Sequence, residues 1–399
     1  MVLGVVVALF AIGTSVLSWS NARTTDLAPR FHWPDEMSNA YFAARIAAGE
    51  PLVVPEPRNV AVGNFIHPRT VNVRSDGALV PGAYLGMPLW YGFLGRVIGT
   101  RAMLFLTPIL AALGLLAFAS IVRRCWNPTI AVVATILLVL HPSTWLFTAT
   151  AFLPNVPFVA LLLMGFALLI PQSSSRGNAD VSFRSSRGAK EEGSRFHAPR
   201  THVVRFLASL GMTKEIMCRL TGGLCIGLAL TIRTHELLWV GAILVALVWR
   251  GSRREAQGSK QWEPPSFRVR SVQLGAVGLG LIFPFIPILF LNASMYGSPF
   301  TTGYALLQEG GGAPTEFARS FLPSWLAAFI APFGWHPVEA FTRFWQYMVV
   351  PYPWFAVLAV VGMGAAFARR KIHHSSFLIH HSVSTIVGTM VLTVWLILS

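Results

Sequence analysis

The chain has 399 residues, of which 54% are hydrophobic and only 12% are charged, and its formal net charge at pH 7 is +15. Apolar runs of this length and number do not fit a soluble core, so the composition predicts an all-α integral membrane protein with several spans. The basic residues lie in short blocks between apolar segments. That placement is typical of membrane topology signals and argues against nucleic-acid binding.

Apolar segments in chain order predict about nine transmembrane helices. With the amino end inside, alternation of nine spans places the basic blocks at residues 123–124, 172–219, 250–271 and 369–371 in the cytoplasm, in agreement with the positive-inside rule. The small residues before Arg23 leave open the alternative that the first span is a cleaved signal. The expected spans are residues 2–19, 102–122, 129–148, 157–170, 220–232, 237–249, 272–291, 351–368 and 383–398.

These spans divide the chain into three parts. Residues 1–171 form an N-terminal membrane part with a long exterior loop, 20–101. Residues 172–219 form a basic cytoplasmic loop that is rich in Ser, Arg and Gly and is predicted to be disordered or inserted. Residues 220–399 form a C-terminal membrane part with a second exterior segment, 292–350.

Two adjacent carboxylates, Asp35 and Glu36, follow the first span in a chain that has few acids. Pro34 fits the first turn of a helix, the acids complement its positive end, and Gly49 is a typical stop, so a helix is predicted between them. Adjacent side chains on a helix point about 100° apart, so one acid can face solvent and the other the protein. The pair therefore either starts a surface helix or deprotonates a hydroxyl or holds a cation at the membrane boundary.

The passage from residue 78 to 99 is broken by Pro81, Gly82 and Pro88, and is therefore expected to contain a helix lying in the membrane interface rather than a full span. Four segments occur in a recognisable order: "PDE" at 34–36, "SDGALVPGAYLGMPLWYGFLGRVIG" at 75–99, "GLALTIRTHELLWV" at 227–240 and "NASMYGSPFTTGY" at 292–304. Together they resemble the GT-C superfamily of membrane glycosyltransferases, in particular its bacterial protein-mannosyltransferase-like and aminoarabinose-transferase-like members.

The resemblance implies a GT-C-like bundle in the bacterial inner membrane. It would move a sugar, with inversion, from a polyprenyl-phosphate donor to a lipid, glycan or protein acceptor at an extracytoplasmic site. Asp35 is the expected general base, Glu36 orients the acceptor, and Arg233 stabilises the departing phosphate with help from His235. No cofactor is expected, and a divalent metal is possible but not indicated. Further substrate contacts are expected from His32, Asn155, Glu236, Tyr304 and Glu309, the last two beside a Gly-rich flap at 307–317.

Several alternatives remain open on the residues alone. Arg233 can form a plain ion pair with Glu236 instead of binding phosphate, and His235 can be a packed core histidine. Asn155 stands in a turn where the resembling family often carries an acid, and an amide cannot act as a base. A transporter or flippase for a lipid-linked or anionic substrate, or a catalytically inactive protein with the same fold, is the alternative function.

Overall fold

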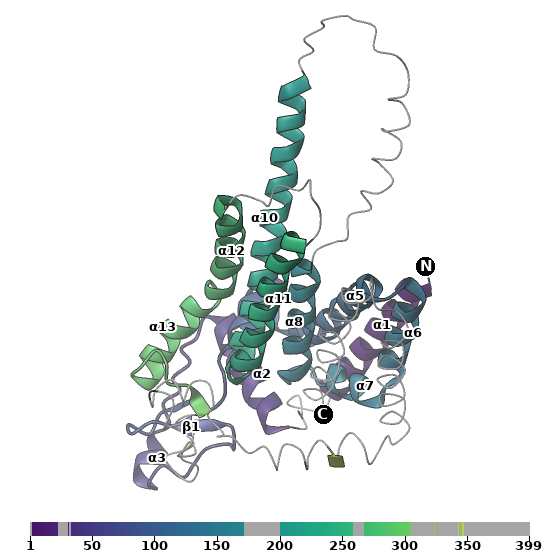
Figure 1. The fold of residues 1–399 in the computed structure, drawn as a ribbon. Coiled ribbons are helices and arrows are strands. Elements are labelled where there is room, and N and C mark those ends of the chain that lie inside the picture. Colours follow the sequence, from purple (N-terminus) through teal and green to yellow (C-terminus); the bar gives the residue numbers. More distant parts are fainter. Residues whose placement is uncertain are drawn as a thin grey trace, which may run out of the picture.

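The protein is mostly helical in the part of the chain that the structure describes. The computed structural model describes residues 2–22, 31, 33–170, 200–257 and 267–304, and the isolated positions 323, 342, 345 and 346. The strands β1 (Val71–Val73) and β2 (Leu79–Pro81) pair antiparallel with Val71 opposite Pro81. The helices, in which η denotes a 3-10 helix, are α1 (Val2–Ala22), α2 (Pro34–Ala48), α3 (Pro57–Ala61), α4 (Gly86–Ile98), η1 (Thr100–Phe105), α5 (Leu106–Cys125), α6 (Pro128–Leu140), α7 (Pro142–Ala149), α8 (Asn155–Leu169), α10 (Arg200–Ile232), η2 (Thr234–Glu236), α11 (Leu237–Gln257), α12 (Phe267–Ile282) and α13 (Phe285–Tyr296) (Figure 1).

Four helical stretches are long and apolar enough to cross a membrane: Val2–Ala22, Thr100–Cys125, Lys214–Ile232 and Ser271–Tyr296. A fifth is added if the bent pair α6 and α7 counts as one span. The described residues therefore support a helical membrane protein, but not the nine spans predicted. The apolar helices at the predicted spans 157–170 and 237–249 are shorter than the about 20 residues that a bilayer core requires. The predicted spans 351–368 and 383–398 lie outside the described residues.

The predicted span at 129–148 is a pair of helices that meet at an angle of 63°. His141 has extended backbone angles, and Pro142 begins α7. Proline has no N–H for the helix ladder and disfavours the helical conformation of the residue before it. The bend therefore follows from the His141–Pro142 pair, which the hydropathy pattern does not register.

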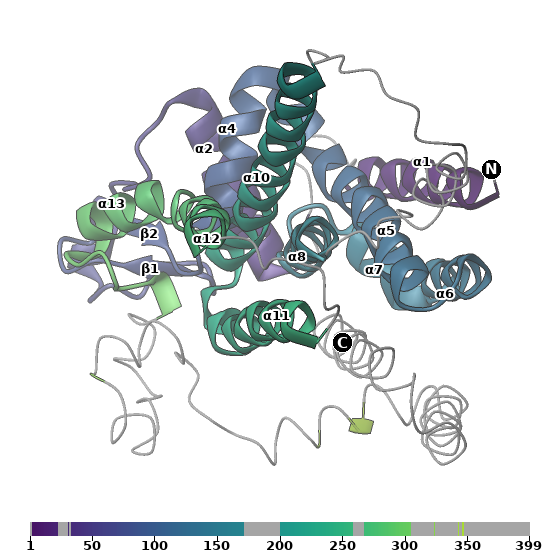
Figure 2. The same cartoon turned by 45° about the horizontal axis from the view of Figure 1, so that its top comes forward.

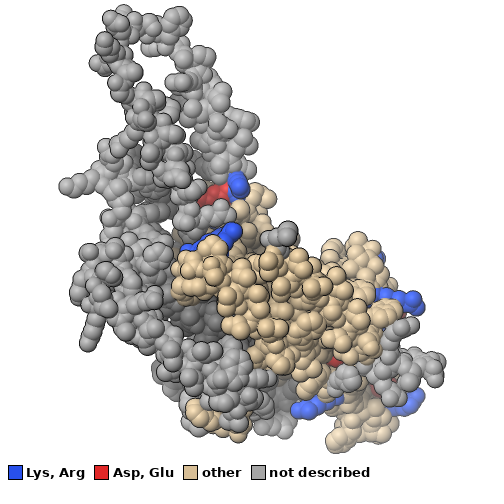
Figure 3. Space-filling model, turned by 90° about the vertical axis from the view of Figure 1, so that its right-hand side faces the viewer, with Lys and Arg blue, Asp and Glu red and all other residues tan. Residues whose placement is uncertain are grey.

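The lipid-facing character of the bundle is clearest on α1. Its side chains Val5, Leu9, Ile12 and Val16 follow helical spacing and are more than half exposed. On the face shown in Figure 3, a broad area of uncharged side chains has Lys and Arg at its edges. Such a surface fits contact with lipid tails, because an α-helix pairs the backbone polar groups of its interior within itself.

Helix α8 lies between α5 and α10 at the centre of the bundle (Figure 2). Phe158, Leu162 and Phe166 along it are almost completely buried. Gly165 allows close approach to α10, because a Cβ atom there would lie 2.8 Å from the carbonyl oxygen of Gly222. Small residues at helix contacts are typical of membrane bundles.

The carboxyl end of α8 is capped from α5. Arg124 donates from Nη1 to the carbonyl oxygens of Ala167 and Ile170, at 2.6 and 2.8 Å. The last carbonyls of a helix have no partner within the helix, and a cation complements the negative end of its dipole. Arg124 therefore marks the end of α8 opposite to Asn155.

Helix α10 is longer than the sequence predicts. Residues 200–219, assigned above to the cytoplasmic loop, form the first part of this 33-residue helix. Glu215 and Arg219 lie one turn apart and form an ion pair of 2.9 Å. A Glu four residues before an Arg favours a helix, although the segment is too polar to read as a span.

The loop predicted to be exterior contains the predicted helix α2, which begins at Pro34 and ends at Gly49 with a left-handed φ of 76°. Its exposed stripe includes Met37 and Tyr41, as expected of a helix at an interface. Helix α4 packs against the opposite face, where a Cβ atom on Gly92 would lie 2.7 Å from the carbonyl oxygen of Ala43. Together α2 and α4 form a platform beside the ends of α8 and α10.

Candidate functional site

The turn after α10 gathers three polar side chains. The helix stops at Ile232, and Arg233 takes an extended conformation with φ −139° and ψ 81° before η2 begins. This short turn brings Arg233 Nη2 within 3.3 Å of Glu236 Oε1, and His235 Nε2 within 3.0 Å of the same oxygen. The ion pair between Arg233 and Glu236, one of the alternatives left open by the sequence, is therefore present.

Glu236 is buried, yet its surroundings favour the carboxylate. Burial raises the pKa of Glu236, but the hydrogen bond from His235 and the charge of Arg233 outweigh it and lower the pKa to about 2. Trp239 Nε1 also donates to this carboxylate. Glu236 therefore carries a negative charge at neutral pH.

Arg233 also reaches α8. Its Nη1 donates to Asn155 Oδ1 at 3.2 Å, and its guanidinium carbon lies 5.8 Å from the centre of the Phe158 ring. Asn155 is the first residue of α8, where the helix dipole is positive. The guanidinium is thus held between a helix start, an aromatic face and a carboxylate.

Asp35 approaches the same place from α2. Its side chain is half-buried in the first turn of the helix. Burial raises the pKa of the Asp35 carboxyl above its usual range, and the positive charge of Arg69 opposes part of this rise. The adjacent Glu36 is 3% exposed and does not line the cavity described below.

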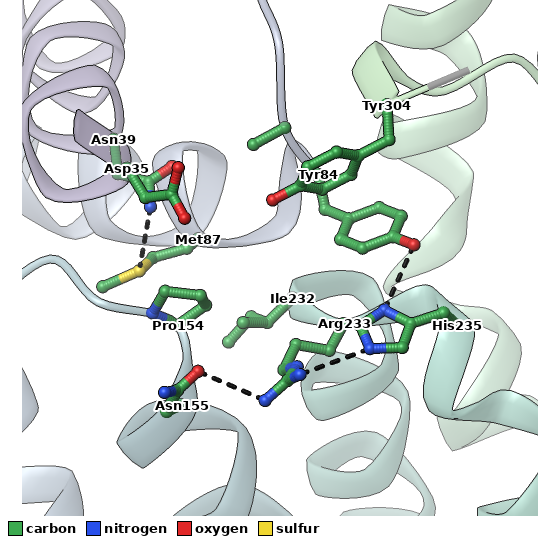
Figure 4. Close-up of a pocket in the computed structure, with 11 residues that line it drawn as sticks. Asp35, Asn39, Tyr84, Met87, Pro154, Asn155, Ile232, Arg233, His235 and Tyr304 are labelled. Carbon is green, nitrogen blue, oxygen red and sulfur yellow. Dashed lines mark hydrogen bonds between the residues drawn. The ribbon is translucent and has the colours of Figure 1, made fainter. Parts of the chain in front are cut away.

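Asp35 and Arg233 line one cavity of about 270 Å³ (Figure 4). The acid and the cation enter it from different elements, α2 and the turn after α10, as the sequence predicts. Buried Asn39 braces the α2 side by donating to the carbonyl oxygen of Phe152 at 2.9 Å. The lining residues are Asp35, Asn39, Ala83, Tyr84, Met87, Pro154, Asn155, Ile232, Arg233, His235 and Tyr304.

An aromatic wall closes one side of the cavity. The Tyr84 and Tyr304 rings meet edge to face with centroids 4.8 Å apart, and Tyr84 stacks on the His235 ring at 5.5 Å. The Tyr84 hydroxyl lies 3.2 Å from His235 Nδ1. Burial raises the pKa of both phenols, so both hydroxyls stay protonated at neutral pH.

Tyr304 reaches the cavity through a clasp with the hairpin. Asn72 on β1 donates from Nδ2 to the carbonyl oxygen of Gly303, and the Tyr296 hydroxyl donates to that of Pro81 at 2.7 Å. A Cβ atom on Gly303 would lie 2.6 Å from the Pro81 oxygen, so only glycine fits there. The chain after α13 is thereby fixed beside β2.

Five of the predicted site residues share the cavity: Asp35, Asn155, Arg233, His235 and Tyr304. Glu236 lies behind Arg233 and holds it. Glu36 is buried on α2 rather than facing the cavity, so the structure gives no support to its predicted contact with the acceptor. His32 and Glu309 lie outside the described residues.

Sequence reasoning missed Tyr84, Asn39 and Met87, which also line the cavity. Their side chains carry no charge, and nothing in their spacing distinguishes them from core residues. The only available signal for Tyr84 was its place after Pro81 and Gly82, where the chain turns before α4. Asn39 was indicated only by its position four residues after Asp35, on the same face of a helix.

Comparison of the chain with protein-family models, curated proteins and solved structures found no significant match. The fold and the site by themselves define a helical membrane protein with a cavity that has an acid on one side and a cation on the other. Among the described residues, no three His, Cys, Asp or Glu side chains are grouped to hold a metal ion.

Proposed function

We propose that the protein is an integral membrane glycosyltransferase with a GT-C-like bundle. It transfers a sugar, with inversion, from a polyprenyl-phosphate carrier to an acceptor hydroxyl. The single observation that carries this proposal is that Asp35 and Arg233, far apart in the sequence, line one cavity of about 270 Å³. Such transfer requires a base for the acceptor proton and a cation for the leaving phosphate.

Asp35 is suited to the role of base. A catalytic base works best when its pKa lies near the working pH, and the pKa of Asp35 is raised by burial in that direction. Its carboxylate would take the proton from the acceptor hydroxyl as the oxygen attacks the anomeric carbon. The bond from that carbon to the phosphate oxygen breaks on the opposite face, which gives inversion.

Arg233 is suited to the leaving phosphate. A guanidinium presents several N–H donors in a fixed plane that matches phosphate oxygens. Its neighbour Asn155 begins α8, and a helix start adds a positive partial charge to the same place. Glu236 holds the guanidinium from the other side.

We infer the side of the membrane from the two ends of α8. Asn155 at its start lines the cavity, whereas Arg124 binds the carbonyl oxygens at its other end. Arg123 and Arg124 form a basic pair at that end, and the positive-inside rule assigns such a pair to the cytoplasm. The cavity would then face the exterior of a bacterial inner membrane, where polyprenyl-linked sugars meet lipid, glycan or protein acceptors.

The direct test is sugar transfer by the purified protein in lipid nanodiscs, with radiolabelled polyprenyl-phosphate sugars and a membrane extract as the acceptor source. Asp35→Asn keeps the shape of the side chain but removes the base, so we expect transfer to fall by about 100-fold to 10,000-fold. The matched control is Asp76→Asn, an exposed acid of the same loop that pairs with Arg74 at 3.3 Å. It should leave transfer near the wild-type rate.

Near-normal transfer by Asp35→Asn would remove Asp35 from the mechanism and leave the acid as a helix start. A wild-type protein that moves lipid-linked sugars across proteoliposome membranes without breaking the sugar–phosphate bond would instead establish the transporter alternative.

A further inference from the structure

The cluster around Arg233 has no net charge when His235 is neutral. Arg233 contributes one positive charge, and Glu236, at 3.3 Å, contributes one negative charge. Asp35 on α2 faces the same cavity and adds a second acid. An anion entering the cavity therefore meets a guanidinium whose charge is already balanced, and additional positive charge would be required to hold it.

His235 is placed to supply that charge. The 3.0 Å contact between Glu236 Oε1 and His235 Nε2 requires a proton on Nε2, because a carboxylate oxygen can only accept. The 3.3 Å approach of Arg233 Nη2 to that nitrogen is then a close contact between two N–H groups. Nδ1 of the neutral ring carries a lone pair and accepts the hydrogen of the Tyr84 hydroxyl at 3.2 Å.

The Tyr84 hydroxyl allows either protonation state of the ring. When a proton enters Nδ1, this nitrogen becomes a donor, and the hydroxyl can rotate and accept it. A phenylalanine at this position would remove the hydroxyl that contacts Nδ1 in both protonation states. Among the described residues, the charged or titratable groups facing His235 from the surrounding elements are Arg233, Glu236, Tyr84, Tyr304 and, across the cavity, Asp35.

We propose that anion binding in this cavity is coupled to the uptake of one proton from solvent by Nδ1 of His235, and that Tyr84 is the positioning residue that permits it. The proton adds one positive charge to the cluster at the moment an anion arrives. The inference deepens the proposed function, because the anion would be the donor phosphate or the polyprenyl phosphate that leaves after transfer. Uptake of one proton on binding makes the affinity fall as the pH rises, by at most about tenfold per pH unit.

The test is isothermal titration calorimetry on the full-length protein in nanodiscs, carried out in two buffers of different ionisation enthalpy. The probes are farnesyl sulfate and inorganic sulfate, whose charges do not change near neutral pH, so any proton taken up enters the protein. The two probes separate recognition of a lipid headgroup from recognition of a free anion. We expect uptake of about one proton per bound anion wherever the ring is neutral in the anion-free protein.

Tyr84→Phe and His235→Gln should reduce this uptake to near zero. The matched control Tyr41→Phe, on the exposed face of α2, should retain it. The ¹⁵N shifts of the His235 ring give a second measurement that needs no variant: a single proton on Nε2 without anion, and protons on both nitrogens with it.

Anion binding without proton uptake, or a His235 ring whose ¹⁵N shifts do not respond to the anion, would overturn the coupling and leave the proposed transfer reaction untouched. Binding of neither probe would overturn it as well. Coupled proton uptake in a protein that transfers no sugar would retain the coupling and overturn the proposed function alone.

Discussion

Asp35 opposes folding at neutral pH. Its pKa is raised by burial, so the folded state holds the proton more tightly than the unfolded chain. The stabilising contribution of such a group is fully present below its unfolded pKa and is lost as the pH rises through the folded pKa. A carboxylate kept at such a cost is more readily explained by function than by helix capping.

The raised pKa of Asp35 leads to a prediction for the stability of Asp35→Asn. The amide cannot ionise, so at neutral pH we expect the variant to melt at a temperature equal to or above that of the wild type. The difference should vanish in acid, where the carboxyl is protonated in both states. Thermal unfolding in detergent, followed by circular dichroism across pH, measures it. A variant that is less stable than wild type at neutral pH would identify Asp35 as a structural cap.

At the scale of single residues, the sequence revealed the groups that carry charge in unusual places. Asp35 and Arg233 were predictable because an acid at a helix start and an arginine at a membrane turn each require an explanation. Tyr84 was not predictable, since its role depends on the distance from its hydroxyl to His235. Glu36 is buried and does not line the cavity, so its expected contact with the acceptor stays a prediction; the rotation of about 100° between neighbours does not say which of the two faces inward.

At the scale of elements, proline and glycine residues predicted the ends of helices more reliably than hydropathy predicted their lengths. Pro34 and Gly49 delimit α2 as predicted. The three-residue strands β1 and β2 are too short to show alternation, so the hairpin was invisible. Helix α10 is also longer than its apolar segment, because hydropathy predicts only the part of a helix that lies inside a membrane and not the length of the whole helix.

The crossing of α4 and α10 depends on a single glycine. A Cβ atom on Gly86 would lie 2.2 Å from the backbone carbonyl carbon of Thr231, and Trp90 Nε1 donates to the Thr231 hydroxyl at 3.0 Å from the next turn. The atoms at this contact belong to the backbone, so they cannot make room for a Cβ atom by a change of side-chain rotamer.

We therefore expect Gly86→Ala to force α4 away from α10 and to destabilise the protein by about 1–3 kcal/mol, the usual range for overpacking. A lower melting temperature in detergent would show it. Gly278→Ala on α12, where a Cβ atom meets no other atom within 4 Å, is the matched control and should be neutral. An unchanged melting temperature for Gly86→Ala would contradict the close crossing.

At the scale of the whole molecule, the membrane class was predictable from composition, but the number of spans was not. A span count from sequence treats each apolar run as one straight helix. The 63° bend between α6 and α7 and the short helix α8 violate that assumption. The orientation is therefore predicted from the positions of charge along the chain and not from the number of helices.

Orientation can be tested with two exposed positions. In a variant whose native cysteines, Cys125, Cys218 and Cys225, are replaced by alanine, Ser75→Cys should react with a membrane-impermeant maleimide in intact cells. Thr129→Cys, at the start of α6 and beside the basic end of α5, should react only after the membrane is permeabilised. Labelling of Thr129→Cys from outside would invert the molecule and place the cavity on the cytoplasmic side.

The clasp between Gly303 and the β1–β2 hairpin also sets an order of events during synthesis. Helix α2, which carries Asp35, leaves the ribosome early, and the Arg233 turn follows much later. The aromatic wall is completed only when α13 has entered the membrane and Tyr304 has reached the hairpin. A nascent chain that stops before this point has both the acid and the cation but not the aromatic wall of the cavity, so the site is completed only after Tyr304 has been synthesised.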